Sequence, residues 1–285
     1  MILCRFDENR LGVVKDGNVS DVTSVLDALP SHRYPFPTED AFIAALPSLR
    51  SKLSAAAEKA TTIPVSKVSF LSPVANPGKI VAAPLNYIKH SQEVAANPNL
   101  HHQNAAHLRP IREAGLFLKA TSSLVGPSQG IVVQHPDRRT DHEVELVAVI
   151  GREAKAIKAK DALQYVAGYT IGLDITVRGS EDRSFRKSID TYTVLGPWML
   201  TSDEIGDPAK LDLSISVNGE IRQKANTSDL ILGVAELIEF ASSFYTLFPG
   251  DILMTGTPEG VGPIAPGDKL RARVERIGEM EVVVR

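Results

Sequence analysis

Residues 141–151 read Asp-His-Glu-Val-Glu-Leu-Val-Ala-Val-Ile-Gly and predict a buried β-strand that begins with two carboxylates. Side chains at positions i and i+2 of a strand point to the same face, so Glu143 and Glu145 lie together, with Val144 and Leu146 on the opposite face. Two neighbouring carboxylates repel each other, and burial raises the cost of that repulsion. A divalent cation would relieve it. A strand whose first turn is solvated is the alternative.

A second apolar stretch, residues 169–178, predicts another strand with Asp174 in its middle. A lone aspartate between two apolar residues is costly unless it is paired. Its partner is either a metal ion shared with Glu143 and Glu145, or Arg178 in a simple salt bridge. Three carboxylates without cysteine or imidazole favour a hard cation, Mg²⁺ or Mn²⁺.

Short strands and turns surround these two stretches. Asp-Gly at 16–17 predicts a hairpin, residues 270–285 predict another, and Asn-Gly at 218–219 predicts a turn after the alternating strand 213–217. Pro-Gly-Asp turns at 249–251 and 266–268 each precede a strand. There is no Gly-x-Gly-x-x-Gly fingerprint after a strand and no phosphate-binding P-loop. Because the strands do not alternate regularly with helices, we expect a β-rich α+β fold and not a doubly wound sheet.

Helices are predicted in three places. The segment ending at Asp40 can cap a helix that Pro47 should end or kink, because proline lacks the backbone N–H and clashes with the preceding turn. Residues 48–60 then form a second helical piece. Residues 86–96 and 234–247 also have helical apolar spacing.

After a loop-rich connector at residues 64–77, the sequence pattern changes to short strands separated by many turns. We therefore place a domain boundary near residue 75, between a small N-terminal domain of residues 1–75 and a larger domain of residues 76–285. Residues 97–112 hold two prolines, three histidines and few large apolar side chains. Loops of this length are often lids or binding loops, so we expect this segment to be mobile.

The composition describes a globular chain. Its 285 residues hold 31 Lys+Arg against 34 Asp+Glu, a net charge of −3, so a nucleic-acid partner is not expected. Cys4 is the only cysteine, which excludes an intrachain disulfide and cysteine-based zinc or iron–sulfur sites. No apolar run reaches the roughly 18 residues of a membrane span, and the first residues do not read as a signal peptide. We expect a cytoplasmic protein without a membrane partner.

Further residues with catalytic potential lie outside the two strands. His90 and Glu93 share one face of a helix, and a carboxylate beside an imidazole orients it and raises its basicity. A helix-surface pair is the alternative. Lys187 and Asp190 read as surface charge in isolation. Residues 254–262 form a glycine-rich loop whose N–H groups can hold a carboxylate, or an ordinary tight turn.

These pieces, in this order, resemble the fumarylacetoacetate hydrolase family over roughly residues 78–285. The resemblance implies a mixed β-sandwich roll, usually in a homodimer, and residues 1–75 are similar to the small N-terminal α/β appendage that many members carry. The matching stretches are Asn86-Tyr87 with His90 and Glu93, Phe117-Leu118-Lys119 with Ser122-Ser123-Leu124, Glu143-Val144-Glu145, Tyr169 with Asp174 and Arg178, Arg186-Lys187-Ser188 with Asp190-Thr191 and Leu195-Gly196-Pro197-Trp198, and Pro249-Gly250-Asp251 with Thr255-Gly256-Thr257-Pro258-Glu259-Gly260-Val261-Gly262.

The resemblance also implies roles for individual residues and a class of substrate. Family substrates are small anionic 2-oxo acids with a second carbonyl, such as acylpyruvates, oxaloacetate and hydroxymuconate-type diacids. One departure is the segment between Asp174 and Lys187, which is shorter than usual and has Glu181 where glutamine is common, so the exact substrate stays open. The implied roles are Glu143, Glu145 and Asp174 as ligands of Mg²⁺ or Mn²⁺, His90 with Glu93 as a catalytic base pair on a lid helix, Lys187 as an oxyanion contact, and Lys119, Arg178 and Thr257 as substrate contacts.

The predicted function is hydrolysis of a carbon–carbon bond in an acylpyruvate-type 2,4-dioxo acid. The metal would chelate the C1 carboxylate and C2 carbonyl, so that the pyruvate part leaves as a metal-stabilised enolate. His90, oriented by Glu93, would deprotonate a water that attacks C4, and Lys187 would stabilise the oxyanion. The same enolate serves oxaloacetate decarboxylation or tautomerisation and the isomerisation of 2-hydroxymuconate-type diacids, which are the alternatives. A binding protein without activity is disfavoured because no ligand and no base is missing.

Overall fold

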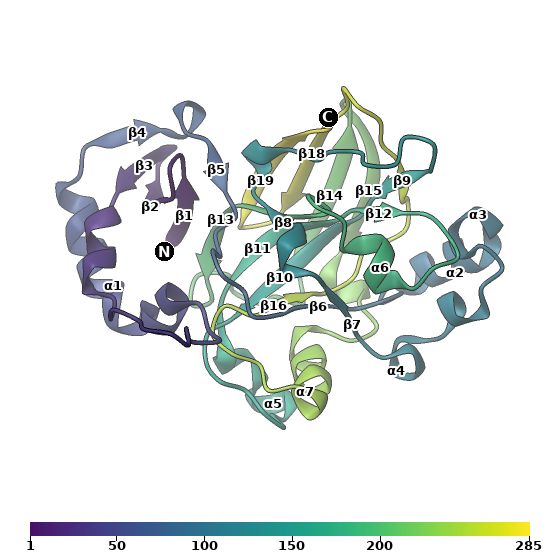
Figure 1. The fold of residues 1–285 in the computed structure, drawn as a ribbon, viewed down its shortest axis with the longest axis horizontal. Coiled ribbons are helices and arrows are strands. Elements are labelled where there is room, and N and C mark those ends of the chain that lie inside the picture. Colours follow the sequence, from purple (N-terminus) through teal and green to yellow (C-terminus); the bar gives the residue numbers. More distant parts are fainter.

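The computed structural model describes residues 1–285 and is built on one large mixed sheet (Figure 1). Most neighbouring strands are antiparallel, whereas β16 with β6 and β13 with β8 are parallel. The α+β prediction is confirmed at this level. The sheet runs in the order β4 (Thr62–Pro64), β3 (Asn18–Asp21), β2 (Arg10–Lys15), β1 (Ile2–Phe6), β13 (Thr193–Thr201), β11 (Val166–Asp174), β10 (Val144–Ile150), β16 (Ile252–Met254), β6 (Ile80–Ala82) and β7 (Phe117–Lys119), with β5 (Phe70–Leu71) on β1 and β8 (Leu124–Val125) on β13.

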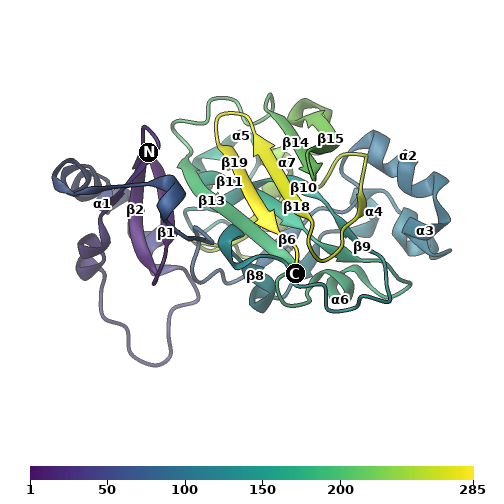
Figure 2. The same ribbon diagram turned by 90° about the horizontal axis from the view of Figure 1, so that it is seen from above.

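Two smaller sheets complete the β-structure. The four-stranded sheet packs over the central strands of the large sheet, and the two share one apolar cluster (Figure 2). Both predicted hairpins form, since Lys15 pairs with Asn18 and β18 with β19, and the predicted Asn218-Gly219 turn joins β14 to β15. The smaller sheets are β12 (Thr176–Val177), β9 (Thr140–His142) and β17 (Gly262–Pro263), and β15 (Glu220–Asn226), β14 (Asp212–Val217), β18 (Lys269–Val274) and β19 (Gly278–Val283).

The helices lie around the sheets, with α2 and α3 at the end of the molecule opposite the N-terminal strands and α5 beside α7 (Figure 1). None of these helices is both long and apolar enough to cross a bilayer. The α-helices are α1 (Ala41–Lys59), α2 (Ile88–Ala96), α3 (Pro98–His101), α4 (Ile111–Ala114), α5 (Ala159–Ala162), α6 (Arg183–Lys187) and α7 (Val234–Phe244), and the 3₁₀ turns are η1 (Thr23–Ala28), η2 (Val65–Lys67), η3 (Ala105–Leu108), η4 (Thr121–Ser123), η5 (Pro127–Gln129), η6 (Leu163–Tyr165) and η7 (Thr227–Asp229).

Helix α1 corrects the prediction of two helical pieces. Asp40 caps its first turn, accepting the N–H of Ile43 at 3.0 Å, as predicted, but the helix then continues through Pro47 to Lys59. Proline removes one helical hydrogen bond at this point. The helix continues because its apolar face, on both sides of the proline, is buried against the sheet. That face is Ile43, Leu46, Leu49 and Leu53.

The N-terminal strands are continuous with the rest of the molecule. Strand β1 pairs with β13, with Ile2 opposite Leu200 and Leu3 opposite Met199. One apolar cluster contains both Leu3 and Ile80, so residues before and after position 75 share a hydrophobic core.

Strand β11 ends at Asp174, which corrects the prediction that Asp174 lies in the middle of a strand. The next strand, β12, belongs to another sheet, because Thr176 pairs with Asp141 and Val177 with Thr140 of β9. Asp174 itself donates its N–H to the carbonyl of Glu143 at 2.9 Å. The change of sheet therefore puts Asp174 opposite the start of β10.

Candidate active site

Three carboxylates meet where β10 begins and β11 ends. The register of the pair, Val144 opposite Leu173, brings Glu143 and Glu145 next to Asp174. One oxygen from each carboxylate lies within 4.8 Å of the others, and all three side chains are buried. A cluster of three hard oxygen donors fits one Mg²⁺ or Mn²⁺ ion. The grouping predicted from the sequence is therefore present.

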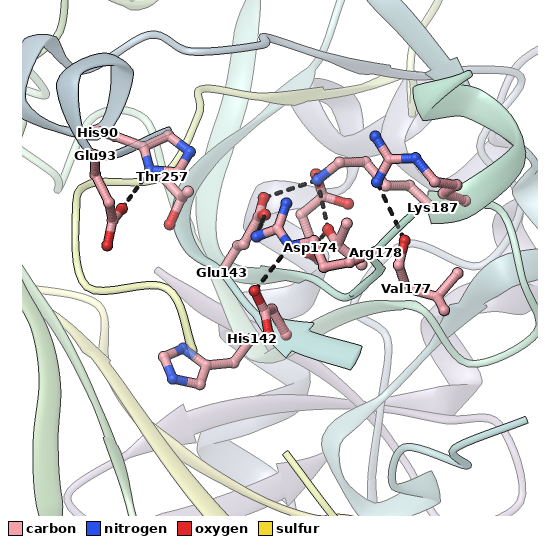
Figure 3. Close-up of polar contacts among 12 residues, drawn as sticks. His90, Glu93, His142, Glu143, Asp174, Val177, Arg178, Lys187 and Thr257 are labelled. Atoms are coloured by element: carbon pink, nitrogen blue, oxygen red, sulfur yellow. Dashed lines mark hydrogen bonds and ion pairs between the residues drawn. The ribbon is translucent and has the colours of Figure 1, made fainter. Parts of the chain in front are cut away.

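Two buried lysines balance these carboxylates. The Nζ atom of Lys187 lies 2.7 Å from Glu143, 2.5 Å from Asp174 and 2.6 Å from the hydroxyl of Thr176 (Figure 3). Lys119 donates to the other oxygen of Asp174 and, at 2.8 Å, to the carbonyl of Tyr192. Lys187 is only 5% exposed, so its interpretation as surface charge is wrong.

Arg178 forms a different pair from the one considered above. Its Nε donates to Asp141 at 2.7 Å and its Nη2 to Glu143 at 2.9 Å, so the salt bridge with Asp174 is not formed. Asp141 also accepts from Arg139 at 2.7 Å. Asp141 had no role predicted from the sequence, although it stands in the same acidic stretch as Glu143.

The carboxylates differ in how strongly the protein favours their charge. Burial raises the pKa of Glu143, but Lys187 and Arg178 outweigh it and hold that pKa well below the usual range. Burial, and then the charge of Asp174, raise the pKa of Glu145 well above the usual range. Burial also lowers the pKa of Lys119. Of the two glutamates, Glu145 is therefore the one whose charge has the greater need of a cation.

His90 and Glu93 form the predicted pair on α2. The Nδ1 atom of His90 lies 2.9 Å from Glu93, whose other oxygen accepts the N–H of Gly260 at 3.0 Å (Figure 3). Because an ionised carboxylate only accepts hydrogen bonds, Nδ1 carries the proton and Nε2 is free to accept one. His90 is 5% exposed, so the pair is not a helix-surface ion pair.

The glycine-rich loop after β16 holds a carboxylate of the protein itself. Gly256 donates its N–H to Glu145 at 2.7 Å, and the hydroxyl of Thr257 donates to the carbonyl of Val144 at 2.9 Å. Gly256 has φ +97°, and a Cβ there would lie 2.8 Å from the side chain of Asn86, so only glycine fits.

Gln223 fixes this loop to the strand and was not found from the sequence. It accepts the N–H of Val144 at 3.0 Å and donates to the hydroxyl of Thr257 at 2.8 Å. Its neighbours on β15 are mostly exposed, so the local pattern carries no signal of its burial.

A single pocket joins these groups. Lys119 does not line it, because it lies behind Asp174. Three further lining residues, His107, Arg183 and Arg186, were assigned no role from the sequence. The polar lining consists of His90, His107, Glu143, Glu145, Asp174, Arg178, Arg183, Arg186, Lys187 and Thr257, and apolar side chains such as Leu85, Val94, Leu100 and Phe117 complete it.

Known proteins with similar sequences and structures carry related names. The chain is 55% identical over 285 residues to a maleylpyruvate hydrolase of Aquipseudomonas alcaligenes, covering 100% of this chain and 99% of the relative. It is 40% identical over 228 residues to a mitochondrial oxaloacetate tautomerase of Rattus norvegicus, covering 76% of this chain and 69% of the relative.

The solved structures include a maleylpyruvate hydrolase from Sphingobium sp. SYK-6 in complex with manganese(II) and pyruvate. It is similar to this structure with a TM-score of 0.84 and 40% sequence identity, covering 100% of this chain and 98% of that one. The family model described as fumarylacetoacetate (FAA) hydrolase C-terminal matches residues 79–285. The chain belongs to the fumarylacetoacetate hydrolase family.

Proposed function

We propose that the protein is a metal-dependent hydrolase that cleaves a carbon–carbon bond of an acylpyruvate to give pyruvate and a carboxylic acid. The observation that carries the proposal is that the buried cluster of Glu143, Glu145 and Asp174 shares one pocket with the His90–Glu93 pair. The maleylpyruvate hydrolase that is 55% identical to the chain supports this reaction, with maleylpyruvate as the substrate.

Glu143, Glu145 and Asp174 would hold one Mg²⁺ or Mn²⁺ ion. When bound, the ion supplies positive charge to the oxygens of the pyruvate part, where negative charge develops. The similar structure with manganese(II) and pyruvate supports both the metal and the fragment next to it.

His90 acts as the general base in this proposal. Its free Nε2 takes a proton from water, and the hydroxide attacks the C4 carbonyl of the substrate. The C3–C4 bond then breaks, and its electron pair passes into the pyruvate part as an enolate. C3 takes up the proton that His90 removed, so one water is consumed and one pyruvate and one carboxylic acid are formed. Glu93 positions the imidazole and stabilises its charged form.

The remaining residues are proposed to stabilise negative charge on the substrate or to contact it. All three N–H groups of Lys187 are used by Glu143, Asp174 and Thr176, so a role at the C4 oxyanion requires one of them to be released when the carboxylates take up the cation. Arg178 and Thr257 line the pocket and are proposed as substrate contacts. Lys119 would reach the substrate only by leaving Asp174.

A second candidate function is tautomerisation of oxaloacetate. The rat oxaloacetate tautomerase, 40% identical over 76% of this chain, favours it. This reaction moves a proton and needs no attacking water.

One assay distinguishes hydrolysis of an acylpyruvate from tautomerisation of oxaloacetate. Purified protein with Mg²⁺ or Mn²⁺ is given maleylpyruvate, acetylpyruvate or enol-oxaloacetate, and both pyruvate formation and loss of enol absorbance are measured. We expect pyruvate from the acylpyruvates. Enol loss from oxaloacetate without any pyruvate from acylpyruvates would support the tautomerase.

We also propose a cytoplasmic homodimer that acts in the catabolism of aromatic compounds, with residues 1–75 as an N-terminal appendage and residues 76–285 as the catalytic domain, a mixed β-sandwich roll. The support for the division is that every proposed site residue follows position 76 and the family match begins at 79. Sedimentation velocity of the purified protein tests the dimer.

A further inference from the structure

Two guanidinium groups in the pocket have no carboxylate partner. Arg183 and Arg186 both lie on α6 and both line the pocket. Arg178, in the same pocket, is paired with Asp141 and Glu143, whereas neither Arg183 nor Arg186 forms an ion pair with any acidic group. Positive charge that the protein does not balance is therefore concentrated on one helix of the pocket wall.

Neutral carbonyls hold Arg186 in position. Its Nε donates to the carbonyl of Glu181 at 2.9 Å and its Nη1 to the carbonyl of Val177 at 3.1 Å, which leaves Nη2 without a partner in the protein. Arg186 is only 2% exposed. Burial, and then the charge of Arg178, lower the pKa of Arg186 to about 10, so the side chain stays charged at neutral pH. A buried charge of this kind is costly until an opposite charge arrives.

Glu181, in the loop before α6, does not supply that charge. Glu181 receives two hydrogen bonds from Arg138, at 3.0 and 2.8 Å. Arg183 bonds only to carbonyls of η3, those of His107 at 2.8 Å and Ala106 at 3.5 Å. The oxygens of an anionic ligand are thus the partners that remain for both guanidinium groups.

His107 adds a hydrogen-bond donor that has no acceptor. The amide of Asn104 is oriented by the N–H of Ala106, which it accepts at 3.0 Å, and by the carbonyl of Ser180, to which it donates at 3.0 Å. Its nitrogen therefore faces Nε2 of His107 at 3.4 Å, so that Nε2 accepts and Nδ1 carries the proton. Nδ1 is buried and has no partner in the protein.

The imidazole of His107 stays neutral beside the arginines. Burial, and then the charges of Arg186 and Arg183, lower the pKa of His107 to about 4. It therefore offers the N–H without adding a third charge, in a residue that is only 5% exposed and lines the pocket.

We propose that Arg183, Arg186 and His107 bind a second carboxylate, at the acyl end of the substrate, and so select dicarboxylic over monocarboxylic acylpyruvates. The proposal rests on the proposed function and names the specificity residues within it. The pocket lining holds three carboxylates and four cationic side chains, so a divalent cation leaves it net positive, as a doubly charged substrate requires. Planar guanidinium groups match the geometry of a carboxylate.

The test compares two substrates in two variants. Arg186→Gln and Arg183→Gln are assayed with maleylpyruvate, which has the second carboxylate, and with acetylpyruvate, which lacks it, at saturating Mg²⁺. We expect kcat/KM for maleylpyruvate to fall about 10- to 100-fold further than kcat/KM for acetylpyruvate. His107→Leu should shift the ratio in the same direction. Arg112→Gln, which removes an exposed guanidinium from α4, is the matched control and should leave the ratio at the wild-type value.

An equal loss on both substrates, or an unchanged ratio, would overturn the subsite. If Arg186→Gln does not fold, Arg186→Lys keeps the charge and loses the fork of two donors, and a smaller shift of the ratio in the same direction is then expected.

A binding measurement separates the subsite from the reaction. 2-Oxoheptanedioate and 2-oxoheptanoate have the same chain length, and neither is an acylpyruvate, so neither has the bond that the proposed reaction cleaves. Calorimetry with Mg²⁺ should give tighter binding of the diacid to the wild type, and Arg186→Gln should remove most of that preference. This result without any hydrolysis would reject the proposed function and keep the subsite. Equal affinity of the wild type for both ligands would reject the subsite whatever the reaction.

Discussion

Glu145 and Glu143 stand two residues apart on one strand face, but their surroundings shift their pKa values in opposite directions. Glu143 receives hydrogen bonds from Lys187 and Arg178. Glu145 receives only the N–H of Gly256. Burial raises the pKa of Glu145, whereas the two cations hold the pKa of Glu143 low. The same substitution at the two positions should therefore have opposite effects on the metal-free protein.

Glu145→Gln should stabilise the metal-free protein at neutral pH. The folded pKa of Glu145 lies above the unfolded value, so its contribution to stability is present at low pH and is lost as pH rises through the folded pKa. Glutamine carries no charge, so the variant does not lose this stability as pH rises. We expect its free energy of unfolding to increase by on the order of 1 kcal/mol, or its Tm by about 2–4 °C. Calorimetric titration should show a large loss of Mg²⁺ and Mn²⁺ affinity in the same variant.

Glu143→Gln is the matched variant, and its stability should change with the opposite sign. The folded pKa of Glu143 is depressed, so its contribution is present at neutral pH and is lost only as pH falls through the folded pKa. Removing the charge leaves Lys187 and Arg178 underbalanced, at a cost of about 3 kcal/mol. Metal affinity should fall here too. Equal Tm shifts in the two variants, or metal affinity retained in both, would contradict the assignment.

His90→Ala should separate metal binding from turnover. His90 is not among the three clustered carboxylates, so Mg²⁺ affinity should stay near the wild-type value. Hydrolysis of an acylpyruvate should fall about 10²- to 10⁴-fold, because the general base is lost. Glu93→Gln should give a milder loss, since the imidazole remains without its charged partner. His135→Ala, which removes an exposed imidazole, is the control. Wild-type turnover in His90→Ala would rule out the base.

At the scale of single residues, the sequence predicted which residues form the site better than it predicted the groups with which they pair. The Glu143–Glu145 and His90–Glu93 pairs follow from spacing within one strand and one helix. Gln223 could not be found, because its burial depends on Thr257 and Pro258 from another part of the chain. Arg178 was paired with the wrong carboxylate for the same reason. Whether Arg178 pairs with Asp141 or with Asp174 depends on which sheet the chain enters after β11.

Helix α1 offers a test at the scale of one element. Pro47 is exposed, so replacing it loses little packing, and alanine restores the N–H that can bond to the carbonyl of Ile43. An interior proline costs about 3 kcal/mol, and alanine loses about 1 kcal/mol more entropy on folding. We expect Pro47→Ala to raise the free energy of unfolding by about 2 kcal/mol in denaturant titrations. Ser51→Ala on the same exposed face should change it by no more than about 0.5 kcal/mol. A lower stability of Pro47→Ala would contradict this account.

Residues 97–112 are a second element-scale prediction. They contain helices of only four residues, α3 and η3, which are too short to be stable alone. Asn104 and Arg183 bond this segment to the loop that carries α6. We expect fast amide hydrogen exchange in the metal-free protein and slower exchange when oxalate and Mg²⁺ are added. Slow exchange without ligand that does not change on addition would show that the segment is not a lid.

The hairpin at Asp16-Gly17 and the turn at Asn218-Gly219 were predicted correctly because turn residues act locally. The two element-scale errors have the opposite cause. Burial of an apolar face carries α1 past Pro47, and the pairing of Thr176 with Asp141 takes the chain into another sheet after Asp174. In both cases the residues that make these contacts lie elsewhere in the sequence.

On the scale of the whole molecule, the site is assembled from distant parts of the chain. Helix α2, strands β10 and β11, helix α6 and the loop after β16 each contribute between one and three side chains to the same pocket. The sequence could nominate these pieces but not their arrangement, which depends on the order of strands in the large sheet. The N-terminal strands support that sheet through the β1–β13 pairing and a shared core, although no proposed site residue lies among them.

The central claim is that this assembly hydrolyses an acylpyruvate with a divalent cation. The most direct measurement is product formation by metal-free protein that receives maleylpyruvate, first with a chelator and then with Mg²⁺ or Mn²⁺. We predict no pyruvate with the chelator, and after metal addition pyruvate and maleate in equal amounts as the enol absorbance is lost. Protein that binds the metal but releases no pyruvate from maleylpyruvate or acetylpyruvate, while it converts the enol of oxaloacetate, would contradict the claim.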